Sequence, residues 1–179
     1  MLLSGHSFGS ETAWGTGGAT YDIAEIQAMC DGGMKFSEPC TPEQIAIFEP
    51  GLKDPRVIAG LPMAGGAGTE PGWFGVDGYN AVKKPYMLMT GTADPVGAEN
   101  VWSRVTSIDF TWLDIEGGCH QLFALGGCKD FPDAEGYALV NTYSLAFAQR
   151  HVLGDTAARV AAILDGTEVL SPKVHFQHK

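Results

Sequence analysis

Short apolar runs alternate with segments of helical pattern along this chain, and this alternation constrains the fold more than any other feature. The runs are Leu2-Leu3-Ser4, RVIAGLPMA from residue 56, KPYMLMTG from residue 84 and DFTWLDIEGG from residue 109. Strands that alternate with helices in this way form a parallel sheet with helices on its faces. We therefore expect an α/β fold in which residues 1–179 form a single domain.

Helices are expected in the segments between and after the apolar runs. Helical patterns begin at about residue 8 and cover residues 22–29, 41–48, 100–105, 133–153 and 155–164. Thr41 and Asp155 suit the N-cap positions of two of these helices. The clearest pattern is 133–153, in which Val140, Tyr143 and Phe147 recur at helical spacing and a glycine follows as the stop signal.

The charge of the chain narrows the classes of partner. The sequence carries a formal net charge of −10, which argues against binding to nucleic acid or to an anionic membrane by bulk electrostatics. No apolar run approaches the ~20 residues of a membrane-spanning helix, and no basic-then-apolar leader begins at Met1. We expect neutral partners, no nucleic acid and no membrane span.

The four cysteines form two close pairs in the sequence, Cys30 with Cys40 and Cys119 with Cys128. Each pair brackets a loop-like stretch that can bend to bring two Cβ atoms within bonding range. Local disulfides predict an extracytoplasmic or secreted location, whereas four reduced cysteines would fit a cytoplasmic protein. Neither pair has C-x-x-C spacing, and no His and carboxylate cluster has metal-ligand spacing, so no metal is expected.

The sequence Gly-His-Ser-Phe-Gly at residues 5–9 has the G-x-S-x-G form of a nucleophile elbow, a sharp turn between a strand and a helix. Gly5 and Gly9 are expected because a tight turn leaves no space for Cβ atoms near the serine backbone. A helix N-terminus favours developing negative charge, so Ser7 is the candidate nucleophile and the Phe8 N–H a candidate oxyanion donor. His6 is expected to point away from the serine.

A serine nucleophile requires a general base and a carboxylate that orients the base. His120 is the candidate base, because it follows a strand-like run on a glycine-rich loop. Asp94 is the candidate acid, because it follows the run at 84–91; Asp77 and Asp114 compete for this role. Nucleophile, acid and base then follow one another in the chain in the order known for α/β-hydrolases.

The motifs GHSFGS, DPRVIAGLPMAGG, KPYMLMTGTADP and IEGGCHQLF resemble the carboxyl half of α/β-hydrolases, and most closely dienelactone-hydrolase-like and platelet-activating-factor-acetylhydrolase-like esterases. The resemblance runs from residue 2 to about residue 153. It implies a partial α/β-hydrolase fold made of family strands five to eight, with Ser7, Asp94 and His120 as nucleophile, acid and base. True dienelactone hydrolases use a cysteine nucleophile, so this chain resembles the serine esterases more.

Family strands one to four, and the loop that supplies the second oxyanion N–H, have no counterpart in this sequence. We therefore expect a truncated domain whose activity is impaired, since loss of one oxyanion donor costs roughly 10²- to 10³-fold in rate. The strand before Ser7 would then have an unpaired apolar edge, which favours a homo-oligomer formed through residues 1–4.

The predicted function is hydrolysis of small-molecule carboxylic esters through an acyl-enzyme on Ser7, without a cofactor. Met63, Trp73, Phe74 and Leu122 are candidates for an apolar acyl pocket, although such residues more often pack the core. Thioesterase, peptidase and acyltransferase activities would use the same triad. The alternative from another class is a catalytically inert α/β-hydrolase fragment or binding module.

Overall fold

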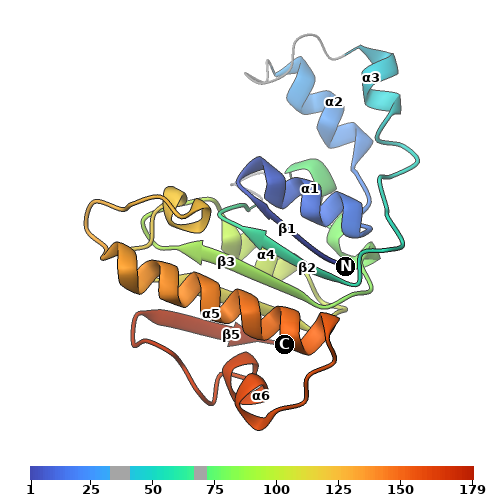
Figure 1. The fold of residues 1–179 in the computed structure, drawn as a ribbon. Coiled ribbons are helices and arrows are strands. Elements are labelled where there is room, and N and C mark those ends of the chain that lie inside the picture. Colours follow the sequence, from blue (N-terminus) through green and yellow to red (C-terminus); the bar gives the residue numbers. More distant parts are fainter. Residues whose placement is uncertain (33–40, 67–71) are drawn as a thin grey trace.

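The computed structural model describes residues 1–32, 41–66 and 72–179. They form a five-stranded sheet in which the strands follow one another in sequence order (Figure 1). The strands are β1 (Leu2–His6), β2 (Ala59–Met63), β3 (Tyr86–Gly91), β4 (Phe110–Ile115) and β5 (Val174–His178). The first four are parallel, and β5 runs antiparallel to β4. The predicted α/β class with a mostly parallel sheet is confirmed.

Helices flank this sheet close to the positions that the sequence predicts. They are α1 (Phe8–Gly17), α2 (Ile23–Asp31), α3 (Pro42–Ala46), α4 (Ala98–Arg104), α5 (Asp133–Val152) and α6 (Ala158–Leu164), with 3-10 segments η1 (Gly72–Phe74), η2 (Gly78–Ala81) and η3 (His120–Ala124). Thr41 caps α3 in a reciprocal capping box with Gln44. The N-cap of α6 is Ala157 and not Asp155 as predicted; Asp155 instead accepts a hydrogen bond from the amide of Ala157. Helices α2 and α3 lie away from the sheet (Figure 1).

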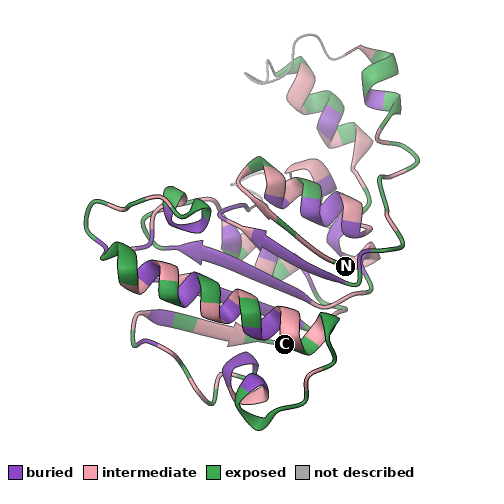
Figure 2. Ribbon diagram, in the orientation of Figure 1, coloured by how far each residue is buried: buried purple, intermediate pink, exposed green. Residues whose placement is uncertain are grey.

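The hydrophobic core has two parts, one on each face of the sheet. Successive residues of β3 alternate between them, because side chains of a strand point to opposite faces. Met87 and Met89 pack in the cluster that contains residues of α5 and α6. Tyr86 and Leu88 pack in the cluster that contains residues of α1 and α4. Strand β3 is therefore buried along its whole length (Figure 2).

The long helix α5 covers one face of the sheet with the stripe that the sequence predicts. Val140, Tyr143 and Phe147 are all buried in the core. Exposed and half-buried residues lie between these positions along the helix (Figure 2). Across the described residues, no helix combines enough length and apolar character to cross a bilayer.

Strand β5 is an element that the sequence analysis did not predict. It is short and contains polar residues, but its apolar positions meet the core: Val174 pairs opposite Ile115, and Phe176 opposite Leu113. The edge of β4 provides the backbone partners for this segment. The pattern of neighbouring residues does not indicate a pairing partner that is distant in the sequence, so this strand could not be predicted from it.

Strand β1 lies at the other edge of the sheet, and among the described residues its strand partner is β2 alone. Leu3 is opposite Gly60 in this parallel pair. An edge presents backbone groups on which another strand can pair. Self-association through this edge remains a prediction.

Candidate active site

Ser7 occupies the sharp turn between the end of β1 and the first residue of α1. Its backbone has φ 57° and ψ −120°, which is rare for a residue with a side chain and costs of order 1–3 kcal/mol. Two backbone hydrogen bonds hold the turn. The Ser7 amide donates to the Met63 carbonyl at 2.9 Å, and the Ser7 carbonyl accepts from the Ser10 amide at 2.8 Å. Ser7 thus lies on a sharp turn between a strand and a helix, which is the local structure that the G-x-S-x-G pattern predicts.

The two glycines of the motif differ in what the structure requires of them. A Cβ atom at Gly5 would lie 2.0 Å from the carbonyl oxygen of Gly9, so the first turn of α1 passes too close to the strand end for any side chain. A Cβ atom at Gly9 would meet nothing within 4 Å. The steric expectation is therefore confirmed for Gly5 and wrong for Gly9, which faces open space.

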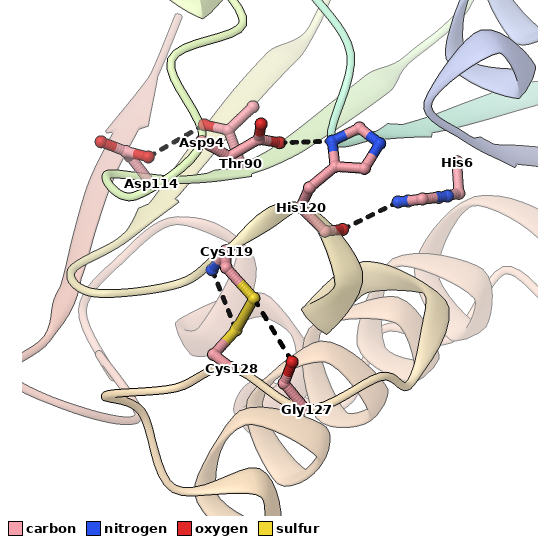
Figure 3. A network of polar contacts seen from close by, with 8 residues as sticks. All are labelled: His6, Thr90, Asp94, Asp114, Cys119, His120, Gly127 and Cys128. Atoms are coloured by element: carbon pink, nitrogen blue, oxygen red, sulfur yellow. Dashed lines mark hydrogen bonds and ion pairs between the residues drawn. A yellow bond between two sulfur atoms is a disulfide. The ribbon is translucent and has the colours of Figure 1, made fainter.

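The side chains of Asp94 and His120 meet, with 2.8 Å between Asp94 Oδ2 and His120 Nδ1 (Figure 3). An ionised carboxylate only accepts, so the Nδ1–H donates, and Nε2 of the neutral ring is the nitrogen without a proton. The Asp94 side chain is 12% exposed and the His120 side chain 35%. The carboxylate is thus shielded from water while part of the imidazole reaches solvent. In this arrangement a carboxylate sets both the tautomer and the orientation of a general base.

Backbone contacts tie together the two loops that carry these side chains. Parallel pairing puts Gly91 at the end of β3 opposite Ile115 at the end of β4. Beyond the strands, the amide of Thr92 donates to the Ile115 carbonyl and that of Ala93 to the Gly118 carbonyl, both at 3.0 Å. A Cβ atom at Gly91 would lie 2.2 Å from the Gly118 oxygen, so this approach requires glycine. This close approach of the two loops brings the side chains of Asp94 and His120 within hydrogen-bonding distance.

His6 is a further member of this network that the sequence analysis did not assign. Its Nε2 lies 2.8 Å from the carbonyl oxygen of His120, and the two ring centroids are 4.6 Å apart (Figure 3). Because a carbonyl oxygen only accepts, the Nε2–H of His6 is the donor. His6 thereby links the strand before Ser7 to the segment that carries the imidazole. The two partners are 114 positions apart, and no local pattern identifies such a bond.

The competing carboxylates are Asp77 and Asp114. Both are described by the structure, and neither forms a hydrogen bond with His120. Asp77 precedes η2. Asp114 Oδ1 accepts a hydrogen bond from Thr90 Oγ1 at 3.0 Å (Figure 3). Burial raises the pKa of Asp114, while the hydrogen bond from Thr90 opposes that rise. The structure thus pairs Asp94, of the three candidates, with the imidazole.

A disulfide closes the loop that begins beside His120. Cys119 and Cys128 are bonded with their Cα atoms 5.7 Å apart, and η3 lies within the loop that they close. One of the two predicted disulfides is therefore confirmed. The other, between Cys30 and Cys40, involves residue 40, which lies outside the described residues.

Removal of this disulfide is expected to destabilise the fold. The double substitution Cys119→Ala and Cys128→Ala should lower the free energy of unfolding by about 2–3 kcal/mol, because an uncrosslinked chain has more conformational entropy when unfolded. Urea unfolding of the two proteins under oxidising conditions measures the difference. Equal unfolding midpoints and slopes would show that the bridge contributes nothing to stability.

A cavity of about 350 Å³ lies beyond the carboxyl ends of the parallel strands, and both Ser7 and His120 line it. No hydrogen bond joins these two described residues. Catalytic hydrogen bonds are often long in the absence of substrate and tighten when it binds. A ligand in this cavity would touch the serine and the imidazole together.

The four residues expected to form an apolar pocket have different surroundings. Trp73 lines the cavity. Phe74 and Leu122 are buried in the two core clusters, and Met63 packs against one of them. The side chains that join Trp73 in the cavity wall include Phe8, Met29, Tyr79 and Val96, together with the carboxylate of Glu11.

Within residues 1–32, 41–66 and 72–179, no group of three or more His, Cys, Asp or Glu side chains is placed to hold a metal ion.

No protein-family model matches the sequence, and no curated protein matches it either. The structure by itself shows an α/β protein with a cavity at the carboxyl ends of its parallel strands. That cavity contains a serine on a strained turn and an imidazole held by a carboxylate.

Proposed function

We propose that this protein is a serine hydrolase of the α/β-hydrolase class that cleaves carboxylic esters. The Asp94–His120 pair carries the proposal, because it is formed at 2.8 Å beside the cavity that Ser7 lines. The strained backbone of Ser7 adds support, since such strain concentrates at functional sites. The parallel sheet supports it as well, because ligands of open α/β sheets bind beyond the carboxyl ends of the strands.

The proposed reaction is a two-step acyl transfer. His120 Nε2 takes the proton of the Ser7 hydroxyl as Oγ bonds to the ester carbonyl carbon, and the oxyanion is stabilised by the amide of Phe8. The tetrahedral intermediate collapses, the alcohol leaves with the proton from His120, and an acyl-serine remains. His120 then takes a proton from water as the water oxygen bonds to the acyl carbon. The second tetrahedral intermediate collapses, the bond to Ser7 Oγ breaks, and Oγ takes the proton back from His120 as the carboxylic acid is released. Asp94 stabilises the imidazolium at both stages.

A fluorophosphonate probe and p-nitrophenyl acetate test this proposal. Wild-type protein should be labelled and should hydrolyse the ester, while Ser7→Ala should lose both reactions. Ser4→Ala is the matched control, because Ser4 is exposed on the preceding strand. Folded wild-type protein that is neither labelled nor active would reject the proposal and favour a binding module. Parallel assays with a thioester and an anilide separate esterase from thioesterase and peptidase activity.

Replacement of His6 with alanine is expected to reduce kcat for the ester by up to about tenfold, since one neutral hydrogen bond is worth ~1 kcal/mol. The physical reason is the loss of the bond that holds the His120 backbone. His6→Gln keeps an N–H donor and should recover part of the loss. The measurement is kcat together with Tm. A lower Tm with unchanged kcat would contradict a positioning role.

We also propose an extracytoplasmic location, because disulfides such as Cys119–Cys128 persist in oxidising compartments. Alkylation of the protein in intact source cells, followed by mass spectrometry without a reductant, tests this. The expected result is an unmodified, bonded pair. Alkylated Cys119 and Cys128 would place the protein in a reducing compartment.

A further inference from the structure

Glu11 is a carboxylate in the same cavity that the proposed reaction does not use. It lies one helical turn after Ser7 on α1 and forms part of the cavity wall. Among the described residues it has neither a hydrogen-bond partner nor an ion-pair partner. Burial raises its pKa to about 7. Glu11 as a whole is half-buried. A carboxylate that is shielded from water and has no partner costs folding free energy when it ionises, so the fold alone gives no reason for its presence.

The rest of the cavity wall suits a cation with an apolar body. Aromatic side chains line it, among them Phe8 and Trp73, whose rings meet edge to face with centroids 6.2 Å apart. Tyr79 and Met29 add further apolar surface. Aromatic faces attract ammonium groups. Of the described residues that form the wall, none is a lysine or an arginine.

We propose that Glu11 binds the cationic group of the substrate, so that the preferred esters carry an alkylammonium group close to the ester bond. The inference rests on the proposed ester hydrolysis at Ser7. One helical turn advances about 5.4 Å along the axis. An ammonium nitrogen two or three carbon atoms from the ester oxygen can therefore reach Glu11 while the carbonyl carbon reaches Ser7. The net charge of −10 favours the approach of cations to the protein.

Titratable groups near Glu11 come from three other segments. Tyr21 precedes α2, Tyr79 lies on η2 and His120 begins η3. Burial, and then the charge of Glu11, raise the pKa values of Tyr21 and Tyr79, so both hydroxyls are neutral around pH 7. His120 is the base for every ester. A comparison of two esters at one pH therefore isolates the contribution of Glu11.

Acetylcholine and its uncharged carbon isostere, 3,3-dimethylbutyl acetate, make this comparison. We expect kcat/KM to be about 10- to 100-fold higher for acetylcholine above pH 8, because an interaction with a charged group is worth ~1.5–3 kcal/mol. The preference should shrink as the pH falls through about 7 and Glu11 becomes protonated. In Glu11→Gln the ratio should be near one at every pH. Glu49→Gln, an exposed site on the same chain, should keep the wild-type ratio.

A binding measurement separates this inference from the proposed reaction. Tetramethylammonium chloride is titrated into the Ser7→Ala protein, with NaCl at equal ionic strength as the control. Binding above pH 8 that weakens at least tenfold when Glu11→Gln is added supports the cation site even if no ester is cleaved. Hydrolysis of both esters at equal rates by wild-type protein, without tetramethylammonium binding, overturns the cation site and leaves the esterase intact.

Thermal stability distinguishes the cation site from a structural role of Glu11. An acid whose pKa is raised by burial destabilises the folded state as the pH rises above its unfolded pKa. Glu11→Gln should therefore raise Tm at about pH 8.5 and change it little at about pH 5. A large fall in Tm at both pH values would show that the carboxylate supports the fold, and would overturn the assignment.

Discussion

Asp94→Asn is expected to lower kcat for ester hydrolysis by about 10³- to 10⁴-fold while the protein stays folded. Asparagine can present its NH₂ group to His120 Nδ1, at the position where Asp94 Oδ2 now accepts at 2.8 Å. The neutral imidazole would then carry its proton on Nε2, and that nitrogen could no longer take the serine proton. The amide also lacks the charge that stabilises an imidazolium.

The matched control for this substitution is Asp114→Asn. Asp114 is a half-buried carboxylate on the neighbouring strand, but its hydrogen bond goes to Thr90 and not to the imidazole. This variant should keep kcat within a few-fold of wild type. Measurement of kcat for both proteins with p-nitrophenyl acetate, after circular dichroism has shown equal folding, decides the assignment. Equal losses in the two variants would remove Asp94 from its proposed role.

Gly5→Ala is expected to prevent the native elbow from forming and to cost more than about 4 kcal/mol of stability. The added methyl group would lie 2.0 Å from the backbone oxygen of Gly9, and backbone atoms cannot move aside without displacing α1 from β1. Gly9→Ala should instead raise the free energy of unfolding. It adds a methyl group in open space within a helix, where alanine is favoured over glycine by roughly 0.5–1 kcal/mol.

Chemical unfolding of the two alanine variants checks this contrast, since they differ only in which glycine of one motif is changed. A soluble Gly5→Ala protein with wild-type stability would show that the turn at Ser7 has a different geometry. A loss of several kcal/mol in Gly9→Ala would show that a neighbour occupies the space beside that position.

The parallel sheet was predictable because buried strands and amphipathic helices leave local patterns in the sequence. The stripe of Val140, Tyr143 and Phe147 is one such pattern, and all three residues are buried in α5. The triad candidates were found for a similar reason, since each follows a strand-like run and parallel strands end at one edge. Ser7 and His120 line one cavity there, and Asp94 contacts the imidazole.

Other features had no local pattern from which to be predicted. Phe74 and Leu122 are as apolar as Trp73, and composition could not tell which of them would face the cavity and which the core. The motif places glycine at both position 5 and position 9. Only the packing of α1 against β1 shows that a side chain is excluded at Gly5 and has space at Gly9.

The sequence by itself determined the class of fold, the order of its helices and of the four parallel strands, and the residue types at the ends of those strands, because these follow from local periodicity and turn chemistry. The tertiary structure alone decided which carboxylate meets His120, that His6 holds its backbone, that β5 completes the sheet and that Glu11 enters the cavity of Ser7. Each of these depends on contacts between segments far apart in the chain, and their geometry is set by packing rather than by neighbours in sequence.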